Sequence, residues 1–290
     1  MSVRWSELRS RAWNRWRGPT AFVLSGGGPA GAAQVGMLQG LLEAGIVPDA
    51  MIGTSVGALN AVFIANDPTL RGAEKLREVW MSMRKEDLFP GGKISSALNI
   101  LRRGSCVFSN SGLRGIIESG LSASTFEQLK IPAHINATQL SNGEERWFSS
   151  GSIADALLAS AAMPGVFPPV QIDGHAYIDG GVTNNVPVLR GAEIGAKNVI
   201  VISVNAASQR RELSRPHDFM MHGFVLARGH RYERDLAAAR QKACVSVIPT
   251  LELGYVAFTD MSQTERLIEA GLAATRKWLS EGPQSRRHRK

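Results

Sequence analysis

The sequence predicts an α/β protein, a three-layer α/β/α domain with a largely parallel central sheet. Short apolar runs typical of buried strands alternate with apolar residues at helical spacing along most of the 290 residues, and this alternation is typical of a parallel sheet covered by helices on both faces. We find no internal repeat and no linker in the chain. We therefore expect one domain over residues 20–280, between a basic N-terminal segment (1–19) and a basic C-terminal tail (281–290).

The first elements form a tight strand-helix-strand-helix unit. Apolar periodicity predicts a strand at 20–24, a helix from about 29 to 44, a strand at 50–53 and a helix from about 56 to 65. A further helix follows, which carries Leu76, Trp80 and Met83 on one face.

The rest of the chain repeats the alternation at wider spacing. Strands are expected near 131–138, 145–149, 176–178, 198–204 and 244–248. Helices are expected at about 152–162, between 221 and 242, and at 261–279.

The glycine-rich stretch Gly26-Gly27-Gly28-Pro29-Ala30-Gly31 lies between the first strand and the first helix. It fits G-x-G-x-x-G, the turn that holds the pyrophosphate of flavin and nicotinamide dinucleotides. That fold also needs an acidic residue about 20 positions later, at the end of the second strand. Asp49 precedes that strand and so lies at its wrong end. A dinucleotide-binding oxidoreductase therefore remains only the weaker alternative.

The second strand ends instead in Gly53-Thr54-Ser55-Val56-Gly57, which fits G-x-S-x-G. Between a strand and a helix, this pattern predicts a nucleophile elbow, a sharp turn that exposes a serine hydroxyl. Gly53 and Gly57 would leave room where strand and helix approach each other. Ser55 is therefore the candidate nucleophile.

A serine nucleophile gives the glycine-rich loop a different use. Acyl transfer needs backbone N–H groups that face the oxyanion of the tetrahedral intermediate, and the loop formed by Gly26, Gly27, Gly28 and Gly31 offers them. We expect Gly27 and Gly28 to be the donors, with the N–H of Val56 as a further candidate.

A general base is also required, and Asp179 is the strongest candidate. It ends the strand-like run "HAYIDGG" and is followed by Gly180 and Gly181, so its carboxylate would stand at a sharp turn. A carboxylate can act as a base near neutral pH when burial raises its pKa. An Asp-Gly hairpin turn without catalytic use, or a triad that employs His175, are the alternatives.

Together, these segments resemble the patatin-like phospholipase family, in its bacterial branch. The three motifs occur in the family's order, and "ASAAMPGVFPPV" (159–170) and "GGVTNNVPV" (180–188) are also similar to it. The resemblance runs from about residue 20 to 205 and more faintly to 280. One departure is Ala30, where many members carry Arg or Lys.

The resemblance implies a serine acyl hydrolase of the phospholipase A or lipid esterase type. Ser55 would be the nucleophile and Asp179 the base of a Ser-Asp dyad without histidine, acting on a lipid or other acyl ester with no metal or cofactor. The segment 88–125 would line or cover the acyl groove, with candidates Leu98, Ile100, Leu101, Val107 and Phe108. A non-catalytic lipid-binding module of the same fold is the second alternative.

The net charge of +8 is located at the two ends of the chain. Residues 1–17 and 286–290 each carry +4, so the body between them is neutral on balance. Nucleic-acid binding is therefore disfavoured, because it needs a cationic face on the folded domain. The N-terminal segment mixes arginines with Trp5, Trp13 and Trp16, which suits contact with an anionic lipid surface. A solvated tail is the equal alternative.

The remaining sequence features concern the cellular compartment. No apolar run reaches the roughly 18–20 residues of a membrane span, and the first 20 residues lack the apolar core of a signal peptide. Cys106 and Cys244 form neither a disulfide framework nor a metal-ligand cluster. We expect a cytoplasmic protein with peripheral membrane contact as a hypothesis, and no metal site.

Overall fold

The computed structural model describes residues 18–89, 106, 108–204, 216–249, 251, 256, 257 and 259–282. Within this part of the chain, eight strands form one sheet, in the order β5-β6-β3-β2-β1-β7-β8 with β4 paired to β3. The strands are β1 (Thr20–Leu24), β2 (Ala50–Thr54), β3 (Ala133–Gln139), β4 (Glu145–Phe148), β5 (Val170–Ile172), β6 (His175–Asp179), β7 (Asn198–Ile202) and β8 (Cys244–Val247).

The centre of the sheet is parallel. β1 pairs with β2 and β7, β2 pairs with β3, and β7 pairs with β8, all in parallel register. Every residue of β1 and β7 is buried, as expected for strands covered on both faces. β4, β5 and β6 are antiparallel additions beside β3.

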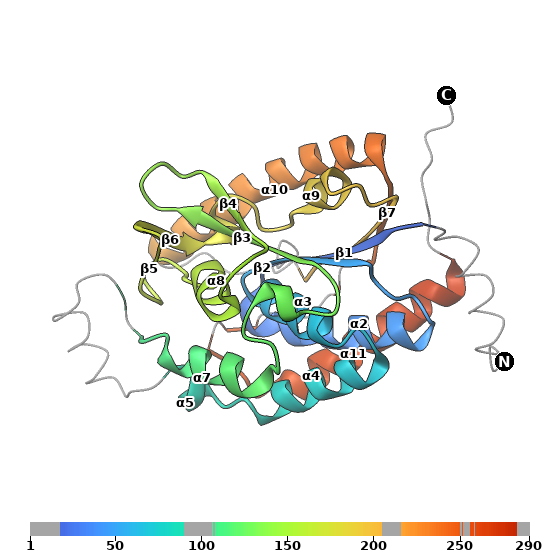
Figure 1. Cartoon of the computed structure of the whole chain (residues 1–290), viewed down its shortest axis with the longest axis horizontal. Coiled ribbons are helices and arrows are strands. Elements are labelled where there is room, and N and C mark those ends of the chain that lie inside the picture. The colour runs from blue at the N-terminus through green and yellow to red at the C-terminus, as the bar shows by residue number, and fades with distance from the viewer. Residues whose placement is uncertain are drawn as a thin grey trace.

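Helices cover both faces of the sheet, so the predicted three-layer α/β/α class is confirmed (Figure 1). In this view α9 (Val188–Glu193) and α10 (Pro216–Lys242) lie on one face, and the first helices and the last helix lie on the other. The helices of the second group are α2 (Ala32–Glu43), α3 (Val56–Asn66), α4 (Leu70–Ser82) and α11 (Thr264–Glu281). Shorter helices are α5 (Lys85–Leu88), α7 (Ser111–Gly120) and α8 (Ile153–Ser160), with 3-10 turns η1 (Gly28–Gly31), η2 (Phe126–Gln128) and η3 (Gly180–Val182).

A close contact between α2 and α11 anchors the helix that follows the glycine-rich loop. A Cβ atom on Gly36 would collide with the carbonyl oxygen of Ile268, and one on Gly271 would collide with the carbonyl oxygen of Ala33. The two backbones therefore approach each other as only glycine allows. This contact fixes α2, and with it the end of the loop that precedes it.

The register around β3 brings two strand ends together. β2 pairs with β3 up to the Thr54–Asn136 partners, and β6 pairs with β3 from the Asp179–Ala137 partners onward. β4 occupies one edge of β3 along both stretches, so β2 and β6 must share the other edge. Because β2 is parallel and β6 antiparallel to β3, their C-terminal ends point at each other. Ser55, which follows β2, therefore meets Asp179.

The observed elements differ from the expected ones mainly where they are short. Four short elements were not predicted from the sequence: β5, α5, α7 and α9. Most of them have too few residues to show a repeating pattern of apolar residues, and the others lie among Gly, Ser and Pro. β5 and β6 form a hairpin whose turn contains Asp173 and Gly174, both at positive φ (50° and 78°). The Asp-Gly hairpin turn thus lies at 173–174, whereas Asp179 caps η3.

Several expectations fall on residues outside the described ranges. These are the basic segments 1–17 and 283–290 and the groove candidates Leu98, Ile100, Leu101 and Val107. In the ranges that are described, no helix has the length and apolar character needed to cross a membrane.

Candidate active site

Ser55 lies at the sharp turn between β2 and α3. Its backbone has φ 55° and ψ −124°, a conformation that costs a non-glycine residue free energy and is often found at functional sites. The Ser55 N–H donates a hydrogen bond to Oγ of Ser160, at the end of α8, at 2.8 Å. The turn that the G-x-S-x-G pattern predicts is therefore present, and it is held in place from a second element.

The two glycines of the elbow lie where main chains touch. A Cβ atom on Gly53 would collide with the carbonyl oxygen of Gly57, and one on Gly57 would collide with the carbonyl oxygen of Ser25. Any side chain at either position would push α3 away from β1 and β2. Gly53 and Gly57 thus permit the close strand-helix approach that exposes Ser55.

Ser55 and Asp179 form a hydrogen-bonded pair. The Ser55 Oγ donates to Oδ2 of Asp179 at 2.7 Å, and the N–H of Gly181 donates to Oδ1 of the same carboxylate at 2.7 Å. Asp179 is only 8% exposed. Burial raises the pKa of its carboxyl to about 6, against the hydrogen bonds from Ser55 and Gly181 and the positive charge of Arg228. A carboxylate with this pKa suits a general base near neutral pH.

The turn after Asp179 shapes the base. Asp179 caps η3 through its bond to Gly181, and Gly180 lies so close to Asn136 that a Cβ atom there would collide with the Asn136 side chain. His175, at the start of β6, is exposed, and its Nδ1 lies 3.3 Å from Nε2 of Gln139. The structure therefore brings Asp179, and not His175, to Ser55.

The four glycines predicted for the oxyanion loop differ in their hydrogen bonds and in the side chains that they contact. The N–H of Gly26 already donates to the carbonyl oxygen of Asn185 at 3.0 Å. Gly31 lies in η1 against the side chain of Val56, where a Cβ atom would come within 2.5 Å. Gly26 and Gly31 therefore make room for neighbours, and we do not retain them as oxyanion donors.

Gly27 and Gly28 remain the candidate donors. Gly28 lines the pocket beside Ser55 and has φ 55°, a left-handed conformation that favours glycine. Among the described residues, neither N–H makes a hydrogen bond. Val56 is the first residue of α3, and the first N–H groups of a helix have no partner within it. These three N–H groups belong to residues of the glycine-rich loop and of the elbow, and they are the candidate oxyanion donors.

A buried amide network holds the glycine-rich loop. Nε2 of Gln34 donates to the carbonyl oxygen of Ser25 at 2.8 Å, and Nδ2 of Asn60 donates to that of Gly31 at 3.1 Å. Asn60 also donates to Oε1 of Gln34 at 2.9 Å and accepts from Nε1 of Trp80 at 2.8 Å. Both ends of the loop are thus bonded to helices, which fixes its shape without using its central N–H groups.

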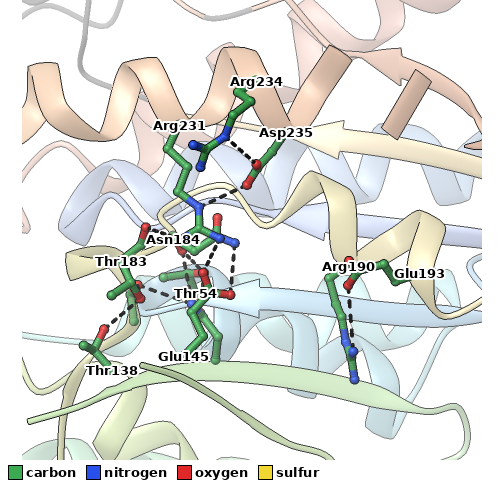
Figure 2. Close-up of polar contacts among 12 residues, drawn as sticks. Thr54, Thr138, Glu145, Thr183, Asn184, Arg190, Glu193, Arg231, Arg234 and Asp235 are labelled. Atoms are coloured by element: carbon green, nitrogen blue, oxygen red, sulfur yellow. Dashed lines mark hydrogen bonds and ion pairs between the residues drawn. The ribbon is translucent and has the colours of Figure 1, made fainter. Parts of the chain in front are cut away.

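A second buried network involves the residues next to Ser55 and Asp179 in the chain, and Figure 2 shows two of its members, Thr54 and Asn184. Oγ1 of Thr54 donates to Oδ1 of Asn136 at 2.6 Å, and Nδ2 of Asn136 donates to the carbonyl oxygens of Gly180 and Asn184 at 3.3 and 3.2 Å. Thr54 precedes the serine and Gly180 follows the aspartate. Asn136 therefore joins the two strand ends directly below the pair.

The network continues to the surface through charged side chains. Figure 2 shows Arg231 reaching from α10 toward Glu145 of β4 and toward Thr183. Arg231 Nη1 donates to the carbonyl oxygen of Thr183 at 3.2 Å, and its Nε donates to Oδ2 of Asp235 at 3.0 Å. Arg234 lies at the outer end, 3.7 Å from Asp235. The loop after Asp179 is thus tied to α10.

An apolar pocket opens beside Ser55. Its lining includes residues of η1, α3, α4, α5, α7 and α8, and among the described lining residues the carboxyl and hydroxyl side chains are those of Asp179 and Ser55. The other lining residues include Leu59, Met83, Leu88, Phe89, Leu113, Ile117, Leu157, Met163, Phe167 and Met261. Such a pocket accepts a hydrocarbon chain and positions it next to the serine.

The segment 88–125 contributes to this pocket where it is described. Leu88, Phe89, Leu113 and Ile117 line it. Phe108 packs edge-on against Phe89, with ring centroids 5.0 Å apart, and so supports the wall without lining it. In the described ranges, no cluster of three His, Cys, Asp or Glu side chains could hold a metal ion.

Comparison with known proteins identifies the family. The model of the family described as patatin-like phospholipase matches residues 22–190, which include the glycine-rich loop, the elbow and the aspartate turn. The chain belongs to the patatin-like phospholipase family.

The chain spans about 14% of the length of the first curated relatives that it matches. Over 191 residues it is 30% identical to the rat patatin-like phospholipase domain-containing protein 7, a match covering 65% of this chain and 14% of the relative. It is 31% identical over 188 residues to the Drosophila melanogaster neuropathy target esterase sws, covering 64% of this chain and 13% of that protein. A Mycobacterium bovis NTE family protein is 30% identical over 187 residues, covering 64% and 49%.

Solved structures support the fold. VipD from Legionella pneumophila has a TM-score of 0.51 at 15% identity, covering 92% of this chain and 67% of that one. Human GIVD cytosolic phospholipase A2 has a TM-score of 0.50 at 12% identity, covering 96% and 60%. At these identities the likeness concerns the architecture alone.

Three side chains near the site were not predicted from the sequence. Ser160 and Asn185 lie within the stretches 159–170 and 180–188, which resemble the family but gave no indication of a role for either residue. Arg228 lies in the middle of α10, among residues that look like an ordinary helix surface. Only the tertiary structure brings it near Asp179.

Proposed function

We propose that the chain is a lipid acyl hydrolase of the phospholipase A or lipid esterase type, with Ser55 as nucleophile and Asp179 as general base. The observation that carries the proposal is the 2.7 Å hydrogen bond from Ser55 Oγ to a buried carboxylate at the mouth of an apolar pocket. A nucleophile, a base and a place for an acyl chain are thereby adjacent. Ester hydrolysis is also supported by the names of two relatives, a phospholipase domain-containing protein and an esterase.

The first half of the reaction forms an acyl-enzyme. Ser55 Oγ attacks the ester carbonyl carbon while its proton passes to Oδ2 of Asp179. The N–H groups of Gly27 and Gly28 stabilise the resulting oxyanion. The bond from carbon to the alcohol oxygen then breaks, and Asp179 returns the proton to the departing alcohol.

The second half restores the enzyme. A water molecule attacks the acyl carbonyl carbon and gives a proton to Asp179. As the bond from Ser55 to the acyl group breaks, Asp179 gives this proton to Ser55 Oγ and the fatty acid leaves. Every proton passes through one carboxylate, which is why its raised pKa matters.

The pocket indicates which part of the substrate is recognised. Since its lining is apolar apart from the dyad, it would bind the acyl chain and leave the alcohol portion outside. We therefore expect medium- and long-chain acyl esters to be better substrates than acetyl esters, because each buried methylene contributes about 0.8 kcal/mol.

Hydrolysis of a p-nitrophenyl ester of medium chain length tests the proposal. Wild type should release p-nitrophenol, and Ser55→Ala and Asp179→Asn should each lower kcat by at least roughly a thousandfold while circular dichroism shows both folded. His175→Ala is the matched control, since the exposed imidazole contacts Gln139 and not the dyad. It should retain wild-type activity.

Two outcomes would contradict the proposal in different ways. Activity that persists in folded Asp179→Asn but not in Ser55→Ala would place the base elsewhere. A wild type inert toward esters of several chain lengths and toward phospholipid vesicles, but able to bind fatty acid, would favour the non-catalytic lipid-binding module.

We propose further that residues 1–17 give peripheral contact with anionic membranes and that residues 20–280 form one catalytic domain. The mixture of arginine and tryptophan in 1–17 supports the first statement. Co-sedimentation with vesicles containing phosphatidylserine should fall when these residues are deleted. Equal binding by the full-length and shortened chains would refute it.

A further inference from the structure

Arg228, on α10, contacts the aspartate turn and Asn185. Its Nη1 donates to the carbonyl oxygen of Gly181 and to Oδ1 of Asn185, each at 3.4 Å. Gly181 is the residue whose N–H holds Oδ1 of Asp179. Arg228 therefore binds one side of the peptide segment that binds the carboxylate.

Asn185 extends this contact to the glycine-rich loop. Its Nδ2 donates to the carbonyl oxygen of Gly26 at 3.5 Å, and its own carbonyl oxygen accepts from the N–H of Gly26. The Asn185 amide is packed between two glycines. A Cβ atom added to Gly26 would come within 2.5 Å of Asn185 Oδ1, and a Cβ atom added to Gly181 would come within 2.8 Å of it. The Arg228 guanidinium thus contacts the aspartate turn directly and is linked to the glycine-rich loop through Asn185.

In the described part of the chain, Arg228 is also the charged side chain that acts on Asp179. The Ser55 hydroxyl and the Gly181 N–H donate to the Asp179 carboxylate, and the Thr138 hydroxyl of β3 donates to the Asp179 backbone carbonyl oxygen; none of these groups titrates near neutral pH. Among the described residues, α10 alone adds a charge, and the positive charge of Arg228 lowers the pKa of Asp179.

The next charged groups are engaged with one another. Arg231 pairs with Glu145 and Asp235, and Arg234 lies beside Asp235. His175, at the far end of β6, contacts Gln139. The two arginines of this group are thus balanced by its two carboxylates.

We propose that Arg228 is a positioning residue of the active site, which holds the aspartate turn through Gly181 and the glycine-rich loop through Asn185. The inference rests on the proposed function of the Ser55–Asp179 pair. Arg228 is not among the residues that line the pocket, so it acts through its two neighbours and not on the acyl chain. Its charge also favours the ionised, basic form of Asp179.

The dependence of kcat/KM on pH tests this role with three variants. Arg228→Gln should lower kcat by roughly ten- to a hundredfold, as expected for displaced catalytic groups, and should move the acidic limb upward by on the order of one pH unit, because an opposite charge is lost. Arg228→Lys keeps the charge, so it should lower kcat with the limb at its wild-type position. Arg234→Gln removes an equal charge from the exposed side of α10 and should change neither quantity.

A measurement without substrate separates this inference from the proposed function. The carbon-13 signal of the Asp179 carboxyl, assigned by its absence in Asp179→Asn, reports the pKa of that group directly. We expect a higher pKa in Arg228→Gln than in wild type. If the wild type hydrolyses no ester but this difference is found, the proposed function fails and the interaction of Arg228 with the Asp179 site stands.

Three results would overturn the inference. The first is a folded Arg228→Gln variant with wild-type kcat and a wild-type acidic limb in the pH profile. The second is an unchanged pKa of Asp179 by carbon-13 titration. The third is an equal shift of the acidic limb in Arg234→Gln, because the shift would then depend only on the net charge of the protein. If Arg228→Gln does not fold, Arg228→Lys and Asn185→Ala carry the test. Both should lower kcat with the limb unchanged, and wild-type kcat in both would also refute the role.

Discussion

Replacing Asp179 by Asn should stabilise the protein above pH 6 while it abolishes hydrolysis. Burial raises the pKa of this carboxyl from 3.8 to about 6, so the folded state resists its ionisation. Below about pH 3.8 the group is protonated in both the folded and the unfolded chain and has no effect. As the pH rises toward 6, the Asp179 carboxyl ionises first in the unfolded chain. The free energy of unfolding therefore falls until this carboxyl also ionises in the folded state.

The size of this effect follows from the two pKa values. Each unit of difference is worth about 1.36 kcal/mol, so ionised Asp179 costs the fold about 3 kcal/mol above pH 6. At pH 5 about half of that cost is present. Asparagine has the same shape, can accept from the Gly181 N–H and can donate to Ser55 Oγ, so it avoids the cost while keeping the contacts.

Urea unfolding of wild type and Asp179→Asn at pH 5 and pH 8 measures this directly. The stability of the variant relative to wild type should increase by about 1.5 kcal/mol between the two pH values, with unchanged m values. Other titrating groups cancel in the comparison. Asp155→Asn is the control: the Arg114 hydrogen bond lowers the pKa of Asp155, so its protonation lies below pH 5 and its effect should not vary from pH 5 to 8.

A relative stability of Asp179→Asn that stays level between pH 5 and 8, or falls, would refute the reasoning. The carboxylate would then be as stable in the fold as in water. A general base with a raised pKa could no longer be argued from burial, whatever the distance to Ser55.

Two further predictions concern activity. Because the ionised form of Asp179 is the base, kcat/KM for an uncharged p-nitrophenyl ester should rise with pH through about 6 and then level off; a level profile from pH 5 to 8 would exclude this carboxyl as the titrating group. Met163→Trp narrows the acyl pocket, so kcat/KM for a dodecanoyl ester should fall roughly tenfold relative to a butanoyl ester, and an equal loss for both would show that Met163 does not contact the chain.

The motifs that could be predicted from the sequence are those in which the same few neighbouring residues determine both the chemistry and the local backbone structure. The elbow needs glycines on both sides of Ser55, because main chains touch there, and the strand and helix around it have clear apolar periods. The parallel centre could be predicted for the same reason, since its buried strands are continuous apolar runs. Short elements such as β5 and α9 have too few residues to show a period.

The contacts that complete the site could not be predicted, because they depend on register and on distant segments. Ser55 and Asp179 are 124 residues apart, and they meet because β2 and β6 share one edge of β3. Asn136 is read from sequence as one polar residue in a buried strand, yet it joins both strand ends. The sequence motif also predicted that Gly26 and Gly31 donate to the oxyanion. In the structure, the absence of a side chain at these two positions makes room for Asn185 and Val56.

The site combines features that each oppose folding, and the polar networks around it explain how they persist. Ser55 has a positive φ and Asp179 is a buried carboxyl, so both would relax if the surrounding chain allowed it. Asn136 ties their strands together from below, and Arg228 binds the aspartate turn from α10. Since these contacts come from different elements, β3 and α10, losing one should displace the dyad without unfolding the sheet. Variants at Asn136 or Arg228 should therefore lose kcat at near-normal stability, a separation that loss of a core side chain would not produce.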